Sequence, residues 1–251
     1  MSVDRKIFNI PFHKGKQPEW TCPSCNRGIL KGKEGTFLRV ETRASKAHRG
    51  HPDWEPEWIS YRYSCQFVCT NPACEEMVFN VGTGSVKEEV DYNDEQGYSA
   101  SYLDIFRPKF FSPHLNIFKI SPNTPVDIRD SIEKSFQLFF INPSASANHM
   151  RIALEQLLDY LKVKKFETVK NKRFIISLHK RIESIPSKVS ELKDLFFAVK
   201  WLGNDASHDG GVSMDNVMDV YDMFESILDE IFGKKTKEIK KIAKKINRRR
   251  R

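Results

Sequence analysis

The spacing of apolar residues changes near residue 125, and this change restricts the chain to a mixed fold. Over residues 61–69, apolar side chains occupy alternate positions, which is typical of a strand with one buried face. Beyond residue 125, apolar side chains recur with the period of amphipathic helices. The sequence therefore predicts an α+β protein, with a small β-domain over residues 20–125 and an antiparallel helical bundle over residues 126–233.

The β-domain is expected to contain further strands at residues 37–42 and 77–81. Residues 82–101 are rich in Gly, Ser and acidic side chains, so a loop is expected there. Residues 107–122 are bounded by prolines and favour an extended segment. Residues 1–19 are polar and contain two prolines, which favours a loosely held N-terminal arm.

Four of the five cysteines form two pairs with the spacing of metal ligands. Cys22 and Cys25 enclose two residues, and Cys69 and Cys74 enclose four. Two such pairs supply the four thiolates of a closed tetrahedral Zn²⁺ site, which leaves no open position for catalysis. The 43 residues between Cys25 and Cys69 exceed the usual spacing of a zinc ribbon, so the excess is interpreted as an inserted hairpin. The prediction is a zinc-ribbon domain with one structural Zn²⁺.

Other candidate ligands are interpreted as structural residues. Cys65 falls on the buried face of the predicted strand and is interpreted as a core residue, with replacement of Cys69 as a ligand as the alternative. The histidines of residues 43–58 are interpreted as solvated loop residues rather than ligands. The two tryptophans of that segment either pack on a neighbouring domain or stack on a nucleic-acid base.

The helical half is expected to contain five helices, whose apolar stripes span residues 128–139, 147–161, 174–182, 189–202 and 217–231. Ser144 or Ser146 is expected to cap the second helix. Gly203 and Asn204 are residues that commonly end helices, so the fourth helix is expected to stop there.

The basic charge of the chain is concentrated in residues 234–251, which form a C-terminal tail with a net charge of +10. The whole chain carries +8, so the remaining residues together carry −2. The tail is interpreted as binding the phosphates of RNA or DNA. The alternatives are a solvated extension, a helix that docks on a partner protein, or a contact with an anionic membrane surface.

The chain contains no apolar run of the ~20 residues that a membrane span requires. The N-terminal residues lack the apolar region of a secretory signal. The odd number of cysteines argues against a framework of disulfides. Together these features predict a cytoplasmic protein without a membrane span.

Three blocks, at residues 110–113, 146–155 and 200–208, resemble the conserved blocks of the bacterial family called domain of unknown function 4145. The resemblance extends over about residues 20–233. It implies a helical domain similar to the HEPN superfamily, often preceded by a zinc ribbon. It further implies a homodimer, a role in phage defence or toxin systems, and in many members RNA cleavage without a metal ion by an Arg followed four to six residues later by His.

Asn204 and His208 match the Asn and His of that motif, but residues 201–203, where its Arg would stand, contain none. Lys200 lies one position further away, and Arg151 on the second predicted helix is an alternative cation. In the catalytic interpretation, His208 transfers protons, Lys200 or Arg151 stabilises charge on a phosphate, and Asn204 holds the scissile group.

A structural interpretation of the same residues stays open. Gly203 and Asn204 would end a helix, His208 would have an internal partner, and Arg151 would form an i,i+4 ion pair with Glu155. The expected function is a nucleic-acid-associated defence or stress-response protein that acts as a ribonuclease of HEPN type. The alternative is a non-catalytic adaptor or scaffold in a defence or toxin–antitoxin complex.

Overall fold

The computed structural model describes residues 4–93, 97–205, 211–233, 242 and 245–247, and residues 91–93 and 97–98 only in their backbone. The described chain forms two compact units, Asp4–Asn116 and the part from Ile117 onward. The first unit is built on an antiparallel sheet and the second on helices, which confirms the α+β class. None of the helices in the described ranges combines the length and the apolar character that crossing a bilayer requires.

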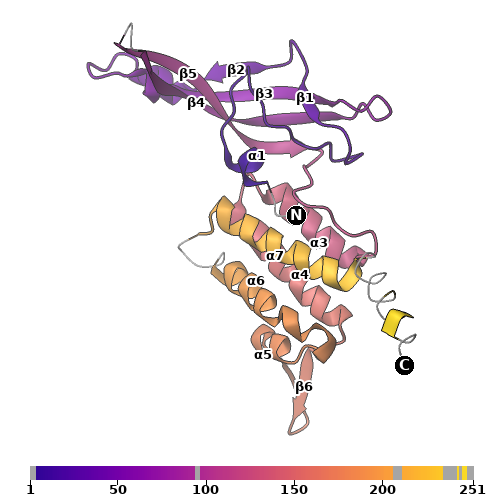
Figure 1. Cartoon of the computed structure of the whole chain (residues 1–251). Coiled ribbons are helices and arrows are strands. Elements are labelled where there is room, and N and C mark those ends of the chain that lie inside the picture. The colour runs from indigo at the N-terminus through magenta and orange to yellow at the C-terminus, as the bar shows by residue number, and fades with distance from the viewer. Residues whose placement is uncertain (1–3, 94–96, 206–210, 234–241, 243–244, 248–251) are drawn as a thin grey trace. The chain divides into compact units, whose positions relative to one another are not determined.

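The first unit contains one antiparallel sheet, in which β1, β3, β4 and β5 follow one another and β2 also pairs with β3 (Figure 1). Its strands are β1 (Leu30–Gly32), β2 (Leu38–Glu41), β3 (Ser60–Cys69), β4 (Met77–Asn93) and β5 (Gly97–Ser112). Figure 1 shows β4 and β5 as a long, curved hairpin.

The described residues of 82–101 do not form the loop that their composition favours. Residues 82–93 and 97–101 belong to the distal half of the β4–β5 hairpin, whose strands pair from Phe79 opposite Ser112 to Asn93 opposite Gly97, with one irregularity at Val81 and Gly82. Each additional residue pair adds backbone hydrogen bonds to the ladder, so polar residues can extend a hairpin that has already been nucleated. The strand propensity of single residues is therefore a weak predictor of secondary structure where pairing with a neighbouring strand stabilises the hairpin.

An aromatic cluster forms the core of the first unit. Trp20 is almost fully buried and makes edge-to-face contacts with Phe12, Phe67 and Phe111 at centroid distances of 5.7, 5.3 and 5.0 Å. Its indole N–H donates a hydrogen bond of 2.7 Å to the carbonyl of Ile7. Ile7 belongs to the helix α1 (Arg5–Asn9). The N-terminal segment is therefore not a loosely held arm, because its phenylalanines complete this core.

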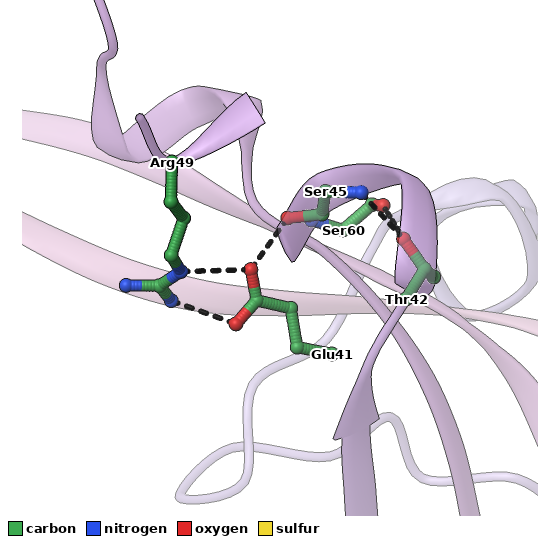
Figure 2. A network of polar contacts seen from close by, with 5 residues as sticks. All are labelled: Glu41, Thr42, Ser45, Arg49 and Ser60. Atoms are coloured by element: carbon green, nitrogen blue, oxygen red, sulfur yellow. Dashed lines mark hydrogen bonds and ion pairs between the residues drawn. The ribbon is translucent and has the colours of Figure 1, made fainter. Parts of the chain in front are cut away.

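Residues 43–58 contain the helix α2 (Arg43–His48) and the 3₁₀-helix η1 (Pro56–Trp58). Figure 2 shows the polar network at the start of this segment. The Glu41 carboxylate accepts two hydrogen bonds from Arg49, at 3.0 and 2.7 Å, and one from Ser45 at 2.7 Å. The hydrogen bonds from Arg49 lower the pKa of Glu41. This network fixes α2 against the end of β2.

The two tryptophans of this segment differ in their surroundings. The Arg49 guanidinium lies 5.4 Å from the ring of half-buried Trp54. Trp58 is 41% exposed, and its ring is 5.4 Å from that of His51. Trp54 therefore packs on its own segment, whereas Trp58 keeps an exposed face.

The second unit is organised around the helix α4, which packs against α3, α6 and α7 (Figure 1). Its helices are α3 (Val126–Leu138), α4 (Pro143–Tyr160), α5 (Leu178–Glu183), η2 (Ser187–Leu192), α6 (Lys193–Asp205) and α7 (Met214–Phe232). The apolar stripes predicted from the sequence are buried in this core, for example Ile132 and Phe136 of α3 and Phe224 of α7.

Two local predictions for the helices are wrong. Asn142 caps α4, with its side chain accepting from the N–H of Ala145, and not Ser144 or Ser146. The predicted third helix is shorter, because its first residues belong to the hairpin of β6 (Phe166–Val169) and β7 (Lys172–Ile175), and α5 follows. Both central residues of the hairpin turn have positive φ, which is the geometry that a two-residue hairpin favours.

Three hydroxyl groups meet in the core of the helical unit. The hydroxyls of Ser135, Ser146 and Tyr221 lie 2.8 to 2.9 Å from one another, on α3, α4 and α7. Burial raises the pKa of Tyr221. Ser146 is the first residue of the block 146–155 that resembles the DUF4145 family. Its hydrogen bonds give it a structural role, because they join these helices.

Candidate functional site

The four paired cysteines converge at one end of the sheet. Cys22 and Cys25 lie on the turn before β1, Cys69 ends β3, and Cys74 lies on the turn between β3 and β4. Antiparallel pairing places Leu30 of β1 opposite Cys69, which brings the two turns together. All four sulfur atoms lie within 4.8 Å of one another, so these residues could hold a metal ion.

The distances within the cluster identify it as a set of four separate thiols. The Sγ atoms of Cys22 and Cys74 are 3.8 Å apart, and those of Cys25 and Cys69 are 3.6 Å apart. A disulfide bond requires a sulfur–sulfur distance of about 2.05 Å. The cluster is therefore spaced for a central ligand and not for disulfides.

Backbone N–H groups point at the sulfur atoms from both turns. The N–H of Gly28 donates to Cys25 Sγ, and the N–H of Asn71 donates to Cys69 Sγ, each at 3.4 Å. The backbone N–H groups of Gly28 and Arg27 lower the pKa of Cys25 to about 6, whereas burial raises the pKa of Cys69. Four adjacent thiols cannot all ionise without a nearby cation, because like charges oppose one another.

Cys65 lies outside the cluster, on the buried face of β3. Its S–H donates to the side-chain oxygen of Asn80 at 3.9 Å, and Tyr63 donates to the same oxygen at 2.6 Å. Burial raises the pKa of Cys65 to about 12. The structure thus places Cys69 in the cysteine cluster and Cys65 in the core.

Gly28 sets the closest approach of the two turns. A Cβ atom at this position would lie 2.4 Å from Cys69 Sγ and 2.8 Å from the backbone nitrogen of Asn71. We expect Gly28→Ala to lower metal affinity at least tenfold, because substitutions next to metal ligands typically cost 10- to 100-fold. Competition with a chromophoric chelator measures this change. Gly50→Ala is the matched control, since a Cβ there meets open space, and a loss of affinity in both variants would contradict the steric explanation.

The end of α6 carries the second candidate site. The helix does not stop at Gly203 and Asn204 but continues to Asp205. Gly203 is buried, and a Cβ there would lie 2.7 Å from the Cβ of Arg151. The glycine therefore allows α4 and α6 to approach closely, and it does not serve to end the helix. As a result, Arg151 lies directly against the turn of α6 that contains Asn204.

Arg151 is also held by its own helix. Its guanidinium forms an ion pair with Glu155 at 2.7 Å, one turn along α4, and a hydrogen bond to Asn148 at 3.4 Å. Side-chain exposures of 29% for Arg151 and 32% for Glu155 leave both groups accessible to a ligand. The ion pair anticipated from the sequence is thus formed beside the candidate site.

Lys200 has a different neighbour. It is buried, and its Nζ lies 3.4 Å from Nδ1 of His179 on α5. His179 Nε2 is in turn 3.7 Å from the Glu183 carboxylate. Nothing in the sequence singled out His179, because it lies more than twenty residues from Lys200 and belongs to no recognisable motif. The Lys200 side chain therefore points toward α5. Of the two candidate cations, Arg151 is the one that packs against Gly203.

His208, the proposed proton-transfer residue, lies outside the described residues, as does most of the basic tail. The chain is described again from Gly211, where the N–H of Val212 donates to the Ser144 hydroxyl at 3.0 Å near the start of α4. The catalytic assignment of Asn204, His208, Lys200 and Arg151 therefore stays a prediction.

Two family models match the chain. Residues 10–111 match a family described as domain of unknown function DUF8608, and residues 133–249 match a family described as domain of unknown function DUF4145. The second match supports the resemblance inferred from the sequence for the helical part, whereas the first shows that the sheet unit is similar to a different family. The comparisons with curated proteins and with solved structures found no match. The chain is thus similar to two domain families of unknown function, one in each of its compact units.

Proposed function

We propose that the protein holds one structural Zn²⁺ ion and associates with nucleic acid as a cytoplasmic defence or stress-response factor. The geometry of the four cysteines supports the metal assignment. Zn²⁺ binds thiolates tetrahedrally at about 2.3 Å, which separates neighbouring sulfurs by about 3.8 Å. The sulfur distances of 3.6 and 3.8 Å agree with that value. Two ligand-bearing turns at one end of an antiparallel sheet are also the arrangement of a zinc ribbon.

The Zn²⁺ ion would have a structural and not a catalytic role. Four thiolates fill its coordination shell, so no position is left for water or substrate. Its binding would contribute roughly 10–16 kcal/mol of apparent free energy to the folded state. The ion would therefore hold the two turns and the end of the sheet together.

The separation of charge along the chain is the observation that carries the nucleic-acid proposal. Eleven basic residues in 234–251 give this segment +10, while the rest of the chain carries −2. Cations that neutralise phosphates release counterions, which makes affinity fall steeply as salt rises. A near-neutral folded body with one dense basic segment is suited to this electrostatic mode of binding.

Binding of a fluorescent single-stranded RNA tests this proposal. We expect a chain that ends at Gly233 to bind at least tenfold more weakly than the full chain at about 50 mM salt, with a shallower dependence on salt. In a matched variant, Ile242 and Ile246, which are both exposed, become Ser while every charge is kept. This variant should bind like the full chain, whereas weaker binding would indicate that the tail makes contact through these isoleucines. A full chain that binds neither RNA nor DNA at low salt would overturn the proposal.

A second function, metal-independent RNA cleavage of HEPN type, is favoured by the contact between Arg151 and Gly203. This contact places a cation beside the turn that contains Asn204, four residues before His208. In this proposal Arg151 substitutes for the missing Arg of the motif and stabilises charge on the scissile phosphate. Incubation of RNA with the protein in the absence of metal ions is the test. Binding without cleavage would leave a non-catalytic adaptor, which we propose would act as a homodimer with a partner protein of a defence or toxin–antitoxin system.

A further inference from the structure

The outward-facing positions of the sheet form two rows across β2, β3, β4 and β5. In strand order, the first row consists of Leu38, Ser64, Val81 and Phe110. The second row consists of Val40, Arg62, Thr83 and Arg107. The alternate positions of these strands, such as Tyr63, Asn80 and Phe106, are buried. We call the two rows, together with Gln66, Phe79, Lys109 and Ser112 at their margins, the outer sheet face.

The apolar and aromatic side chains of this face are exposed. Phe79 and Phe110 are 49% and 46% exposed. Phe79 lies opposite Ser112 and Phe110 opposite Val81, so the two rings are diagonal neighbours on β4 and β5, a relation that places residues about 7–8 Å apart. A groove of about 510 Å³ lies between the rows, with Leu38, Val40 and Val81 in its lining. Several large apolar side chains exposed together beside a groove are typical of a binding surface.

The charges of the outer sheet face all have the same sign. Arg62 and Lys109 line the groove, and Arg107 is exposed in the second row. None of the residues that define the face is acidic. Among the described residues, these three cations have no carboxylate partner, and Arg62 donates only to the carbonyl of Tyr61 at 3.4 Å. The face is therefore complementary to an anion that also offers flat apolar surfaces.

From this combination we infer that the outer sheet face binds single-stranded RNA, with bases stacked on Phe79 and Phe110 and phosphates beside Arg62, Arg107 and Lys109. Exposed aromatic rings bind unpaired bases, whereas the base faces of a duplex are covered by their neighbours. The polar groups Ser64, Gln66, Thr83 and Ser112 supply hydrogen-bonding partners for the 2′-hydroxyls of RNA. The inference rests on the proposed association with nucleic acid and names its substrate class and its contact surface on the folded body.

The test compares binding of a labelled twelve-nucleotide oligouridine by full-length variants. Phe79→Leu combined with Phe110→Leu keeps the apolar character of the face and removes the aromatic rings. Since each stacked base contributes substantially to affinity, we expect the double variant to bind at least about tenfold more weakly, with an unchanged dependence on salt. Arg62→Gln combined with Lys109→Gln should instead make the salt dependence shallower by about two phosphate contacts.

A matched control is Tyr102→Leu, another exposed aromatic substitution on β5. Tyr102 is 53% exposed, and its pKa is raised by partial burial and by the negative charges of Glu88, Glu57 and Glu55 nearby. This acidic setting repels phosphates, so the control should bind like the wild-type chain. Photo-crosslinking to an oligouridine that contains one 5-bromouracil should label the peptide with Phe79 or Phe110.

The outcomes distinguish the binding of RNA by the outer sheet face from the more general proposal that the protein associates with nucleic acid. A wild-type chain that binds no nucleic acid would overturn both. Wild-type binding that the leucine pair leaves unchanged would overturn the sheet-face inference alone and leave the proposed association with nucleic acid through the tail standing. Equal affinity for oligouridine, its DNA counterpart and a duplex would contradict the assignment to single-stranded RNA.

Discussion

Replacing Cys69 with alanine should abolish stoichiometric zinc binding and unfold the N-terminal unit. Cys69 joins the end of β3 to the cysteine cluster, and its sulfur lies 3.6 Å from that of Cys25. Three remaining thiolates cannot close the tetrahedral shell, so much of the roughly 10–16 kcal/mol of zinc-binding free energy is lost. Metal analysis of protein purified under reducing conditions should fall from one zinc per chain to near zero. Near-ultraviolet circular dichroism should report the loss of packing around Trp20.

Cys65→Ala is the matched control for this substitution. Cys65 and Cys69 lie on the same strand and the same buried face, but the thiol of Cys65 contacts Asn80 and not the cluster. The control should keep one zinc per chain and lose only the stability of a small buried side chain, about 1 kcal/mol. Zinc retained in the Cys69 variant, or lost in the Cys65 variant, would contradict the assignment of the ligands. A metal content near zero in the wild-type chain would contradict the site as a whole.

If the helical unit cleaves RNA, His208→Ala should lower the rate of cleavage by about 10²- to 10⁴-fold, since proton transfer contributes on that scale. Arg151→Met should lower it by about 10²- to 10³-fold, the typical effect of removing a group that stabilises transition-state charge. Methionine keeps an aliphatic stem that can pack on Gly203, so the Arg151 variant should lose charge without losing the contact between α4 and α6. The rate is measured on single-stranded and structured RNA in the presence of a chelator.

Two substitutions control for general effects of losing a histidine or a cation. His51→Ala removes an exposed histidine of the sheet unit, and Lys164→Met removes an exposed cation of the helical unit. Both should cleave at the wild-type rate, and all four variants should unfold at nearly the same temperature. Intact RNA after incubation with the wild-type chain would exclude the ribonuclease and leave the adaptor. Equal activity of the His208 variant and the wild type would point to a contaminating nuclease.

The sequence predicted the features that depend on neighbouring residues. The alternation over residues 61–69 predicted β3, and the helical period predicted α3, α4 and α7, because both patterns arise from burying one side of a local element. The spacing of the cysteine pairs also predicted a cluster of four thiols, because the two cysteines of each pair are only a few residues apart and can bind the same metal ion. Residues 174–182 were predicted as one helix, but they contain the end of the strand β7 and most of the helix α5. A short strand followed by a short helix fitted the same apolar spacing, and the sequence did not separate the two possibilities.

Gly203 illustrates what a sequence cannot provide. A glycine followed by asparagine is a typical end of a helix, yet α6 extends to Asp205. Glycine stands at position 203 because a side chain there would collide with Arg151 of α4. The reason for this glycine is a contact between helices whose residues are about fifty positions apart. The same holds for Lys200, whose partner His179 comes from another helix.

The sequence alone determined the order of a sheet unit and a helical unit, the identity of the clustered cysteines and the concentration of positive charge in the tail. These follow from composition and short-range spacing. Only the tertiary structure decided that the β4–β5 hairpin extends through a loop-like composition, that Arg151 and not Lys200 lies against Gly203, and that an aromatic, basic face is left exposed on the sheet. Each of these depends on which distant strands and helices pack together, a relation that the local pattern of residues does not encode.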